Sequence, residues 1–355
     1  MIRVGLIGFG MAGRVFHAPL LSSVDGIELA AVLERSTNLA TERYPGVTVY
    51  RSLDAMLADD TLDLFVVATP STTHFDVARV VVEAGKNAIV DKPVAITSDQ
   101  IAELIALARA KGTMLVPFQN RRWDGDFLTV KRMVDEGALG ELVHFESRFD
   151  RWRPDRPTNR LWKEDPASGG VLLDLGTHIA DQALVLFGKP DTVSAEVLQE
   201  REWARVNDGF EIRMRYDGFT VVLGANSLSI PSGPRFHLRG TKGNFWKYGV
   251  DPQEAALTKV TRIADADWGV EPESEWGRLY ADVDGTTQMM PVETLTGNYR
   301  RYYEGVRDAL TGRREAPVKA VEAWRTARLL EYAQESSEKR REVVCDWSGE
   351  PESSS

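Results

Sequence analysis

Short apolar runs alternate with helical stretches over the first 118 residues, and this alternation constrains the fold of the 355-residue chain more than any other feature. Six runs have the β-branched or apolar composition of strands: Arg3–Ile7, Glu28–Leu33, Val47–Tyr50, Asp63–Ala68, Asn87–Val90 and Met114–Phe118. Strands that alternate with helices form a parallel sheet covered by helices on both faces. We therefore predict an α/β domain over residues 1–119.

The clearest helix in this region is Ser98–Lys111. Its apolar residues recur at i, i+3, i+4 and i+7 and so line one helix face: Ile101, Leu104, Ile105 and Ala108. Thr97 and Gln100 form a capping box at its start, and Gly112 stands where a helix ends. The sequence thus predicts both ends of this helix.

The pattern changes after residue 120, where strands follow strands. Helices are predicted at Asp126–Glu136 and Val171–Phe187, and strands at Glu141–Phe149, Thr192–Gln199, Phe210–Tyr216, Phe219–Ala225 and Arg235–Arg239. Consecutive strands without helices between them indicate a largely antiparallel sheet. We expect an α+β domain with an open sheet over residues 120–345 and a flexible tail over 346–355. Two final helices, Tyr299–Leu310 and Val318–Lys339, are expected to pack back on the first domain.

Composition excludes several classes of protein. The net charge of −10 argues against general nucleic-acid binding and against binding to anionic membranes. No uncharged apolar stretch of the sequence approaches the ~20 residues that span a bilayer. The single cysteine, Cys345, cannot form an internal disulfide, and no cysteine cluster is available for zinc or iron–sulfur ligation. We expect a soluble cytoplasmic protein.

A glycine-rich turn follows the first predicted strand: Gly8-Phe9-Gly10-Met11-Ala12-Gly13. Gly8 permits the tight turn, Gly10 lets the backbone approach a pyrophosphate, and Gly13 allows close packing of helix on strand. The helix N-terminus behind the turn favours phosphate. Because a strand precedes the motif, a helix follows it and an acid ends the second strand, we interpret it as a Rossmann dinucleotide site. A glycine-rich turn of some other α/β protein is the alternative.

Glu34 ends the second predicted strand and is placed to accept hydrogen bonds from the adenosine ribose hydroxyls. A carboxylate there repels a 2′-phosphate, which favours NAD over NADP. Arg35, Ser36 and Thr37 follow at once, and a guanidinium with two hydroxyls could hold that phosphate instead. We predict NAD or NADP as the cofactor, with NAD preferred, and Glu34 and Arg35 among its contacts.

The run Val90-Asp91-Lys92-Pro93 stands at the carboxyl end of the fifth predicted strand. Open α/β sheets bind ligands there, so Lys92 is expected to face the nicotinamide. Pro93 constrains the backbone and can adopt a cis bond. We predict Lys92 as catalytic and Asp91, Lys92 and Pro93 as cofactor contacts. A surface lysine before a proline turn is the alternative.

In the second half, Asp174-Leu175-Gly176-Thr177-His178 places an acid and a histidine on one face of a helix. The pair could be half of a metal site, a general base with its orienting carboxylate, or a solvated pair. No third or fourth ligand stands nearby in the sequence, so we predict no metal. Histidine accepts protons well near neutral pH, and we predict Asp174 and His178 as catalytic.

The loop Arg148–Lys163 is rich in basic and aromatic residues, among them Arg151, Trp152 and Trp162. Such a mixture can bind single-stranded nucleic acid. On an acidic chain with a dinucleotide motif we prefer a lid at the rim of the substrate site, where indole faces stack on sugar or cyclitol C–H groups. A solvated interface loop is the remaining alternative.

These motifs together resemble the Gfo/Idh/MocA oxidoreductase family over nearly the whole chain. The resemblance includes the glycine-rich start, Ala68-Thr69-Pro70 with His74, Lys92-Pro93, and Asp174 with His178. Four further runs are similar to the bacterial subgroup that contains NADP-dependent scyllo-inositol dehydrogenase: Asn120–Thr129, Phe149–Arg151, Tyr248–Glu254 and Gly297–Tyr299.

The resemblance implies roles for individual residues. It implies that Lys92, Asp174 and His178 serve catalysis, and that the chain forms a homodimer or homotetramer through the open face of the second sheet. Two residues depart from the pattern. Asp91 replaces a more usual glutamate and has a shorter reach, and Glu34 stands where the NADP-using relative lacks an acid.

We therefore predict a two-domain NAD(P)-dependent oxidoreductase that moves hydride between a secondary alcohol of a cyclitol, polyol or sugar and nicotinamide. Thr69, Pro70 and His74 are expected beside the cofactor, although Pro70 and His74 could instead serve a turn and a helix start. Expected substrate contacts, besides the catalytic residues, are Asn120, Arg122, Trp123, Arg151, Trp162 and Tyr299. No nucleic-acid, membrane or metal partner is expected.

Two other functions remain open. A dinucleotide-binding regulator without turnover would share the glycine motif but would not need Lys92, Asp174 and His178. A glycoside-cleaving enzyme of the same fold would oxidise its substrate transiently with tightly held NAD. It would release sugar without net reduction of the cofactor.

Overall fold

The computed structural model describes residues 1–156, 164–263 and 268–352. Its first sheet has six strands in the order β3-β2-β1-β4-β5-β6, and all of them run parallel. The strands are β1 (Ile2–Ile7), β2 (Ile27–Leu33), β3 (Thr48–Tyr50), β4 (Leu64–Val67), β5 (Asn87–Asp91) and β6 (Leu115–Phe118). Each of the six predicted strands is present, and the doubly wound Rossmann topology is confirmed.

Helices cover both faces of this sheet because its strands are apolar on both sides. Along β4, Leu64 and Val66 point into one apolar core, while Phe65 and Val67 point into the other. The helices in this region are a π-helical turn at Gly13–His17, α1 (Ala18–Leu21), α2 (Leu39–Arg43), α3 (Leu53–Leu57), a 3₁₀ turn at Ser71–Thr73, α4 (His74–Glu83) and α5 (Ser98–Lys111).

Helix α5 begins and ends where the sequence predicts. The Thr97 side chain accepts a hydrogen bond from the Gln100 amide, and the Gln100 side chain bonds back, which completes the capping box. Gly112 ends the helix in the left-handed conformation at φ 65°.

The second sheet has nine strands in the order β14-β13-β12-β11-β7-β10-β9-β8-β15. The pair β7–β10 is parallel and its other neighbouring pairs are antiparallel, which confirms the predicted architecture. The predicted strands are β7 (Leu142–Arg148), β8 (Thr192–Leu198), β9 (Gly209–Tyr216), β10 (Phe219–Asn226) and β11 (Phe236–Gly240). Sequence analysis missed β12 (Gly243–Lys247), β13 (Gly277–Val283), β14 (Thr286–Val292) and β15 (Val343–Val344).

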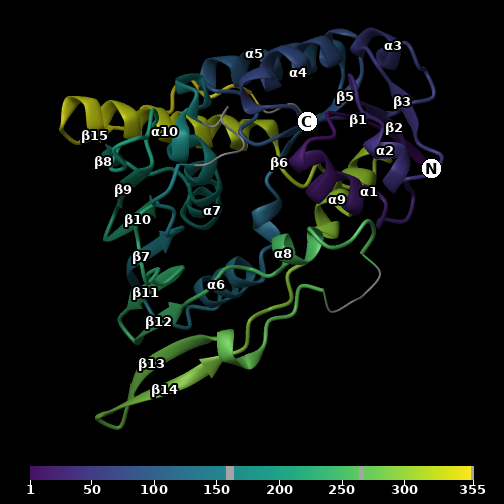
Figure 1. Ribbon diagram of the computed structural model, residues 1–355. Coiled ribbons are helices and arrows are strands. Elements are labelled where there is room, and N and C mark those ends of the chain that lie inside the picture. Colours follow the sequence, from purple (N-terminus) through teal and green to yellow (C-terminus); the bar gives the residue numbers. More distant parts are fainter. Residues whose placement is uncertain (157–163, 264–267, 353–355) are drawn as a thin grey trace.

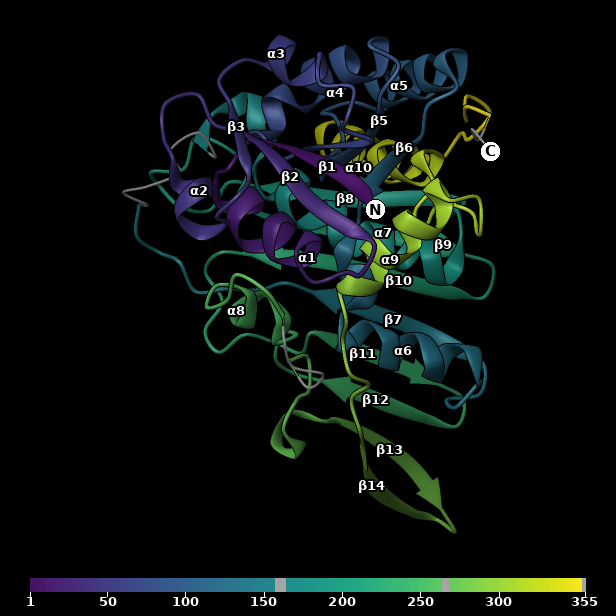
Figure 2. The same ribbon diagram turned by 90° about the vertical axis from the view of Figure 1, so that its right-hand side faces the viewer.

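One face of this sheet packs on helices. Phe145, Ile212 and Leu238 of the strands share an apolar core with Val130 and Ile179 of helices α6 (Gly125–Asp135) and α7 (Thr177–Phe187). These helices lie on the side of the sheet that faces the first domain (Figure 1). The hairpin β13–β14 extends from the far edge of the sheet, away from the rest of the chain (Figure 2). The remaining short elements are 3₁₀ turns at Asn120–Trp123, Pro166–Ser168 and Glu273–Glu275, a π-helical turn at Leu172–Gly176, and α8 (Gln253–Leu257).

The last two helices join the domains, as predicted. Helix α9 (Arg300–Leu310) buries Tyr302 and Tyr303 in the core of the first domain. Helix α10 (Ala320–Lys339) contributes Trp324 to the first domain and Tyr332 to the second. Because one helix contributes to both cores, the two sheets are held at a fixed relative position.

The segment expected as a flexible tail from residue 346 packs against the body of the protein. The Trp347 ring meets Trp324 and Tyr332 edge to face, with centroids 6.3 and 5.8 Å apart. Glu350 forms ion pairs with Arg325 and Lys189. The polar composition of 349–352 misled the prediction, because ion pairs and one tryptophan are enough to dock this short segment.

One helical segment of the described chain, Pro166–Phe187, has the length and hydropathy of a membrane-spanning helix. It belongs to the protein core: 61% of its most apolar window is buried inside the structure. Leu172, Ile179 and Ala183 of this segment pack against the second sheet. Its apolar character is therefore explained by packing.

The shared role of α10 predicts the effect of removing Trp324, whose side chain is 3% exposed. Trp324→Ala should lower the free energy of unfolding by about 3–5 kcal/mol, the usual cost of deleting a buried large aromatic ring. Glu338→Ala, on the exposed end of the same helix, is the control and should change it by less than about 0.5 kcal/mol. Denaturant unfolding of the full chain measures both. An equally small effect of both variants would contradict the docking of α10 on the first domain.

Candidate active site

The glycine-rich loop has the geometry that its sequence predicts. Gly8 adopts a φ of +100°, and a Cβ atom there would lie 2.8 Å from the carbonyl oxygen of Ala68. A Cβ on Gly13 would lie 2.2 Å from the carbonyl oxygen of Gly8. Only glycine fits either position, because any side chain would collide with backbone. The turn and the close helix–strand packing are thus both present.

Gly10, at the tip of the loop, is exposed and faces open space, with no atom within 4 Å of a Cβ placed there. Met11 and Ala12 are partly exposed beside it. Phe9 is instead buried and packs edge to face on Tyr44, with ring centroids 6.3 Å apart. The loop therefore offers backbone to a pyrophosphate and anchors itself through Phe9, which fits a dinucleotide.

Glu34 forms hydrogen bonds within its own loop. Its side chain is buried, and its carboxylate accepts hydrogen bonds from the Ala40 amide at 2.9 Å and the Thr37 hydroxyl at 2.5 Å. The carboxylate thus satisfies an amide in the first turn of α2, a place that favours an acid. In this structure Glu34 stabilises the loop after β2, and its expected contact with the adenosine ribose stays a prediction.

Two arginines remain at this loop. Arg35 and Ser36 are exposed. Arg51, which sequence analysis missed, donates to the carbonyl oxygens of Glu34 at 2.8 Å and Thr37 at 2.5 Å. Arg51 follows β3, and its guanidinium reaches the loop after β2 that carries Arg35. A 2′-phosphate bound at this loop would need charge-assisted hydrogen bonds.

His74 ties together the two strand ends on the other side of the cofactor groove. Its Nδ1 lies 2.7 Å from the Pro93 carbonyl oxygen and its Nε2 lies 2.8 Å from the Thr69 carbonyl oxygen. The side chain is buried and opens α4. Pro70 is exposed next to Thr69. His74 therefore fixes the backbone around Thr69 and Pro93.

Lys92 and Asp174 meet across the two domains, as predicted. The Lys92 ammonium donates to the Asp174 carboxylate at 2.9 Å and to the Asp174 carbonyl oxygen at 2.8 Å. Lys92 follows directly on β5, and its bond to Pro93 is cis. Asp174 lies in the π-helical turn Leu172–Gly176, a form of helix that is frequent at functional sites.

Asp91 turns away from this pair. Its carboxylate accepts from the Lys92 amide at 2.7 Å and lies 3.7 Å from His17 Nε2. Burial raises the pKa of Asp91, but the nearby imidazole of His17 and the charges of His74 and Lys92 outweigh burial and hold the pKa below its ordinary value. Asp91 therefore braces the end of β5 against the helix that follows the glycine loop.

His178 completes the group from the first turn of α7. Its side chain is buried, and its Nδ1 has no hydrogen-bond partner in the described part of the chain. Burial lowers the pKa of His178 well below its ordinary value. The positive charges of Lys92, Arg121 and Arg151 lower it further, and Asp174 opposes them. The imidazole is consequently neutral near pH 7 and able to accept a proton.

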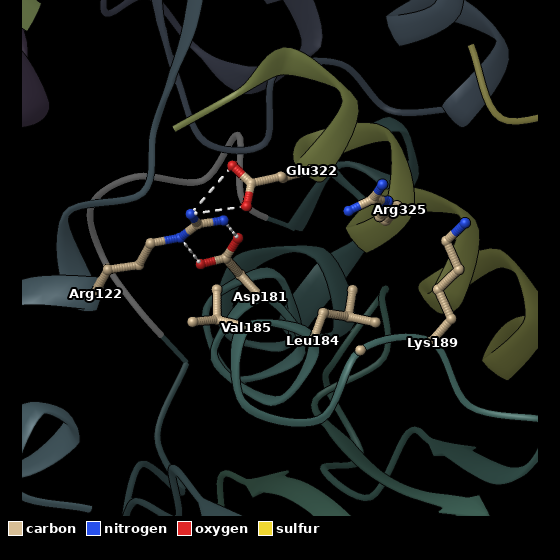
Figure 3. Close-up of a pocket in the computed structure, with 8 residues that line it drawn as sticks. Arg122, Asp181, Leu184, Val185, Lys189, Glu322 and Arg325 are labelled. Carbon is tan, nitrogen blue, oxygen red and sulfur yellow. Dashed lines mark hydrogen bonds and ion pairs between the residues drawn. The ribbon is translucent and has the colours of Figure 1, made fainter. Parts of the chain in front are cut away.

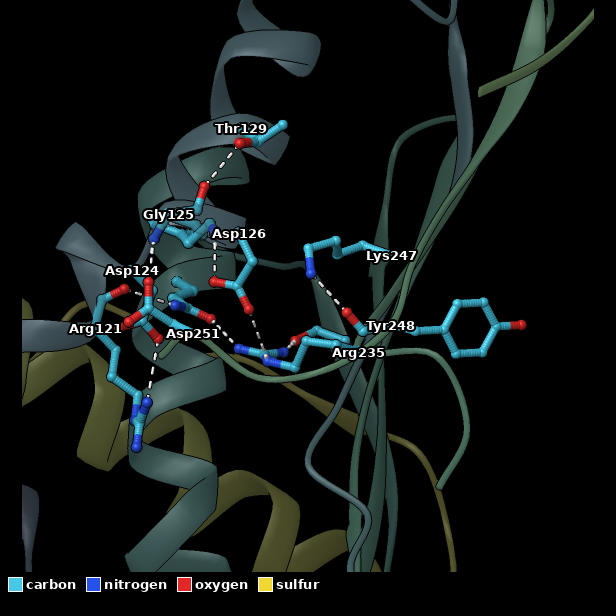
Figure 4. A network of polar contacts seen from close by, with 12 residues as sticks. Arg121, Asp124, Gly125, Asp126, Thr129, Arg235, Lys247, Tyr248 and Asp251 are labelled. Carbon is cyan, nitrogen blue, oxygen red and sulfur yellow. Dashed lines mark hydrogen bonds and ion pairs between the residues drawn. The ribbon is translucent and has the colours of Figure 1, made fainter. Parts of the chain in front are cut away.

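A buried network of charges lies next to this site (Figure 4). Arg121 pairs with Asp124 at 3.2 Å and with Glu254 at 2.5 Å. Tyr299, predicted as a substrate contact, is fully buried and donates to Asp124 at 2.5 Å. Burial raises the pKa of Asp124 to about 7, and Arg121 opposes that rise. Tyr299 is thus part of the support of the site.

The same network extends to α6 and the second sheet. Asp251 accepts from the Gly125 amide at 2.6 Å, and Arg235 lies 3.7 Å from Asp126. Burial and the neighbouring carboxylates raise the pKa of Asp251 to about 8. The sequence does not reveal these contacts, because the partners are more than a hundred positions apart.

Arg122 is committed to carboxylates rather than to the site (Figure 3). Its guanidinium donates to Asp181 at 2.7 and 2.6 Å and to Glu322 at 3.2 Å, between α7 and α10. These ion pairs line a small pocket together with Leu184, Val185, Gly188, Lys189 and Arg325. The pocket belongs to the domain junction, and Arg122 holds that junction.

Arg151 lies beside the catalytic group, and its guanidinium sits 5.9 Å from the Phe149 ring centroid. Burial lowers its pKa, the charge of Arg153 adds to this, and Asp174 opposes it. Asn120 is buried, and Trp123 packs edge to face on Tyr302 with centroids 5.7 Å apart. Trp162 lies outside the described residues.

Comparison with known proteins places this geometry among oxidoreductases. Residues 2–118 match the profile of the "Oxidoreductase family, NAD-binding Rossmann fold", and residues 127–246 match the "GFO/IDH/MocA C-terminal domain". The chain is 39% identical to the uncharacterized oxidoreductase YdgJ of Escherichia coli, over 97% of this chain and 98% of that protein. It is 32% identical to the scyllo-inositol 2-dehydrogenase (NADP(+)) IolW of Bacillus subtilis, over 97% and 96%.

Solved structures give the same result. An oxidoreductase of Bacillus subtilis, yvaA, superposes with a TM-score of 0.93 at 32% identity, covering 97% of this chain and 98% of that one. The oxidoreductase YPO2259 of Yersinia pestis superposes with a TM-score of 0.90 at 37% identity, covering 97% of each chain. Both domains of the fold are therefore shared with these proteins.

The low pKa of His178 predicts how stability depends on pH. In the unfolded chain a histidine has a pKa of about 6.5, so on acidification the unfolded state takes up this proton before the folded state does. The free energy of unfolding should therefore fall as the pH decreases below about 6.5. The free energy of unfolding of the His178→Gln variant should fall less between about pH 7.5 and about pH 5.5. Urea unfolding at both pH values measures this, and equal losses in the two proteins would contradict a buried neutral His178.

Proposed function

Because the chain belongs to the Gfo/Idh/MocA family of oxidoreductases, we propose that it transfers hydride between a secondary alcohol of a cyclitol, polyol or sugar and a nicotinamide dinucleotide. One observation carries the proposal: the Lys92 ammonium is held at 2.9 Å by the Asp174 carboxylate, next to the buried imidazole of His178. A cation, a carboxylate and a neutral base at the carboxyl end of a Rossmann strand suit the oxidation of an alcohol.

Each residue of the site has its own role in the proposed reaction. His178 accepts the proton of the substrate hydroxyl, and the ammonium of Lys92 stabilises the negative charge that develops on the same oxygen. Asp174 fixes Lys92 and accepts a hydrogen bond from the substrate. The bound nicotinamide supplies the acceptor for the hydride that leaves the carbinol carbon. Holding these groups in position lowers the barrier by several kcal/mol.

We propose NADP as the preferred cofactor. The carboxylate that would repel a 2′-phosphate, Glu34, is buried and bonded to Ala40 and Thr37. Arg35 is exposed on the same loop, and Arg51 braces that loop. The similar protein IolW is described as NADP-dependent. This preference replaces the one that sequence analysis derived from Glu34.

A scyllo-inositol-like cyclitol is the substrate class that we test first, because IolW is an inositol dehydrogenase by name. Hydroxyl-rich rings need several polar partners, and the site offers Lys92, Asp174, His178 and Arg151. We also propose a cytoplasmic homo-oligomer that associates through the open face of the second sheet. The two other candidate functions, glycoside cleavage and cofactor-dependent regulation, have no observation that favours them over oxidation.

The experiment that tests the function is a screen of the purified chain. Inositols, aldoses and gluconic-type acids are offered with NAD or NADP, and reduced nicotinamide is followed by its absorbance. Net reduction with a polyol supports the proposal. Release of sugar from a glycoside without net reduction would favour the glycoside-cleaving enzyme. Tight NADP binding without turnover of any substrate, in either direction, would favour the regulator.

Lys92→Met keeps much of the stem volume but removes the ammonium, and His178→Asn removes the proton acceptor. Each should lower kcat by about 10²-fold or more, the usual contribution of a positioned acid or base. Since the two residues act as a unit, the double variant should be scarcely slower than either single one. Lys86→Met, at an ion pair remote from the site, is the matched control and should turn over normally. Near-normal kcat in both single variants would overturn the assignment.

Arg35→Ser should weaken NADP binding by about 10- to 100-fold, the loss of one or two charge-assisted hydrogen bonds, and leave NAD binding nearly unchanged. Glu34→Gln, which keeps an acceptor for the Ala40 amide, should leave the ratio of the two affinities unaltered. Titration calorimetry with both dinucleotides measures the ratio. A ratio that moves with Glu34 but not with Arg35 would restore the ribose role of the carboxylate and the preference for NAD.

A further inference from the structure

Three metal-ligating side chains converge on the face of the second sheet opposite its helices. His144 and Glu146 stand two positions apart on β7 and so point to the same side of the strand. His237 on β11 is paired in register directly with Glu146. The neighbours that alternate with them, Phe145 and Phe236, lie in the apolar core on the other face. The pleat and the register therefore bring the three together.

The distances between the ligand atoms of these three side chains indicate what the group can bind. Glu146 Oε2 lies 3.8 Å from His144 Nε2 and 3.7 Å from His237 Nδ1, and the three ligand atoms all lie within 4.8 Å of one another. The two carboxylate–imidazole distances are too long for hydrogen bonds. They are close to the roughly 3.3–3.6 Å that separates nitrogen and oxygen ligands around a tetrahedral zinc ion. The three ligand atoms are thus arranged around a common centre, at distances that suit a bound metal ion.

The surrounding groups hold these side chains in place. The His237 ring stacks on Trp246 of β12, with centroids 3.9 Å apart. The other Glu146 oxygen, Oε1, accepts from Arg148 at 3.1 Å. Arg148 is itself paired with Asp150 at 2.8 Å and Glu211 at 3.2 Å, so its charge is already offset by carboxylates. Glu146 Oε2 consequently stays directed at the two imidazoles.

We propose that His144, Glu146 and His237 bind a divalent transition-metal ion of the zinc class, with water in the fourth position. Two imidazoles and one carboxylate form a ligand set that suits zinc and its first-row neighbours, whereas magnesium and calcium prefer oxygen ligands. The bound ion joins β7 to β11 across the middle of the nine-stranded sheet. This site is remote in the fold from the Rossmann strand ends and independent of the oxidoreductase chemistry.

The test is a titration of the chelator-treated, full-length chain with zinc chloride, followed by calorimetry and by the thermal midpoint. We expect one ion per chain and a raised midpoint, because an ion that binds only the folded state stabilises it. His144→Ala and His237→Ala should each weaken zinc binding by about 100-fold or more, since even residues behind the ligands are worth 10- to 100-fold. Magnesium chloride should leave the midpoint unchanged.

Glu211→Gln is the matched control, because it removes a partner of Arg148 on the same face but no ligand. It should bind zinc like the wild type. His144→Gln and His237→Gln provide a second pair of variants that keep the side-chain bulk, and the thermal midpoint in chelator shows that each is folded. A wild-type chain that binds no zinc would overturn the proposal. So would equal affinity in the wild type and the folded His144/His237 double variant.

Discussion

The ion pair between Lys92 and Asp174 is the contact on which the proposed chemistry depends. Lys92 stands at the end of β5 in the first sheet, and Asp174 stands in a π-helical turn of the second domain. Their 2.9 Å separation depends on the packing between the domains, to which α10 contributes by entering the cores of both. The catalytic group is thus a product of interdomain packing.

Charged side chains are arranged differently at the loop after β2 and around His178. At the loop after β2, Glu34 is withdrawn into the start of α2 and leaves arginines at the surface. At the reacting end, burial lowers the pKa of His178, and the charges of Lys92, Arg121 and Arg151 lower it further, so that the imidazole is neutral. Both arrangements follow from the same rule, that a buried charge must be paired or must lose its charge. In the proposed function, the arginines at the first loop would attract an anionic dinucleotide, and the neutral imidazole would accept the proton of the substrate.

Next to the site, the interior of the protein contains a cluster of buried charged side chains. Arg121, Asp124 and Tyr299 form one connected group in which every member is within hydrogen-bond distance of another. Burial holds the pKa of Asp124 near 7. Such networks specify one geometry, because any displaced member would leave a charge unpaired in a medium of low dielectric. This explains why residues expected to touch the substrate, among them Tyr299 and Arg122, are instead committed to neighbouring side chains.

The sequence by itself determined the six strands of the first sheet, the main helices and the local turns. Period and capping fixed helix α5 to the residue, and the glycine spacing fixed the loop after β1, because these depend on interactions within a few positions. The sequence also selected Lys92, Asp174 and His178 by residue type. The tertiary structure alone decided which side chains remain free. Glu34 turned to Ala40 and Arg122 to Asp181, and β15 paired with β8, a strand distant in the chain. A sequence pattern shows which side chains are able to form hydrogen bonds and ion pairs. The partner that each side chain takes depends on distances that exist only after the two domains pack.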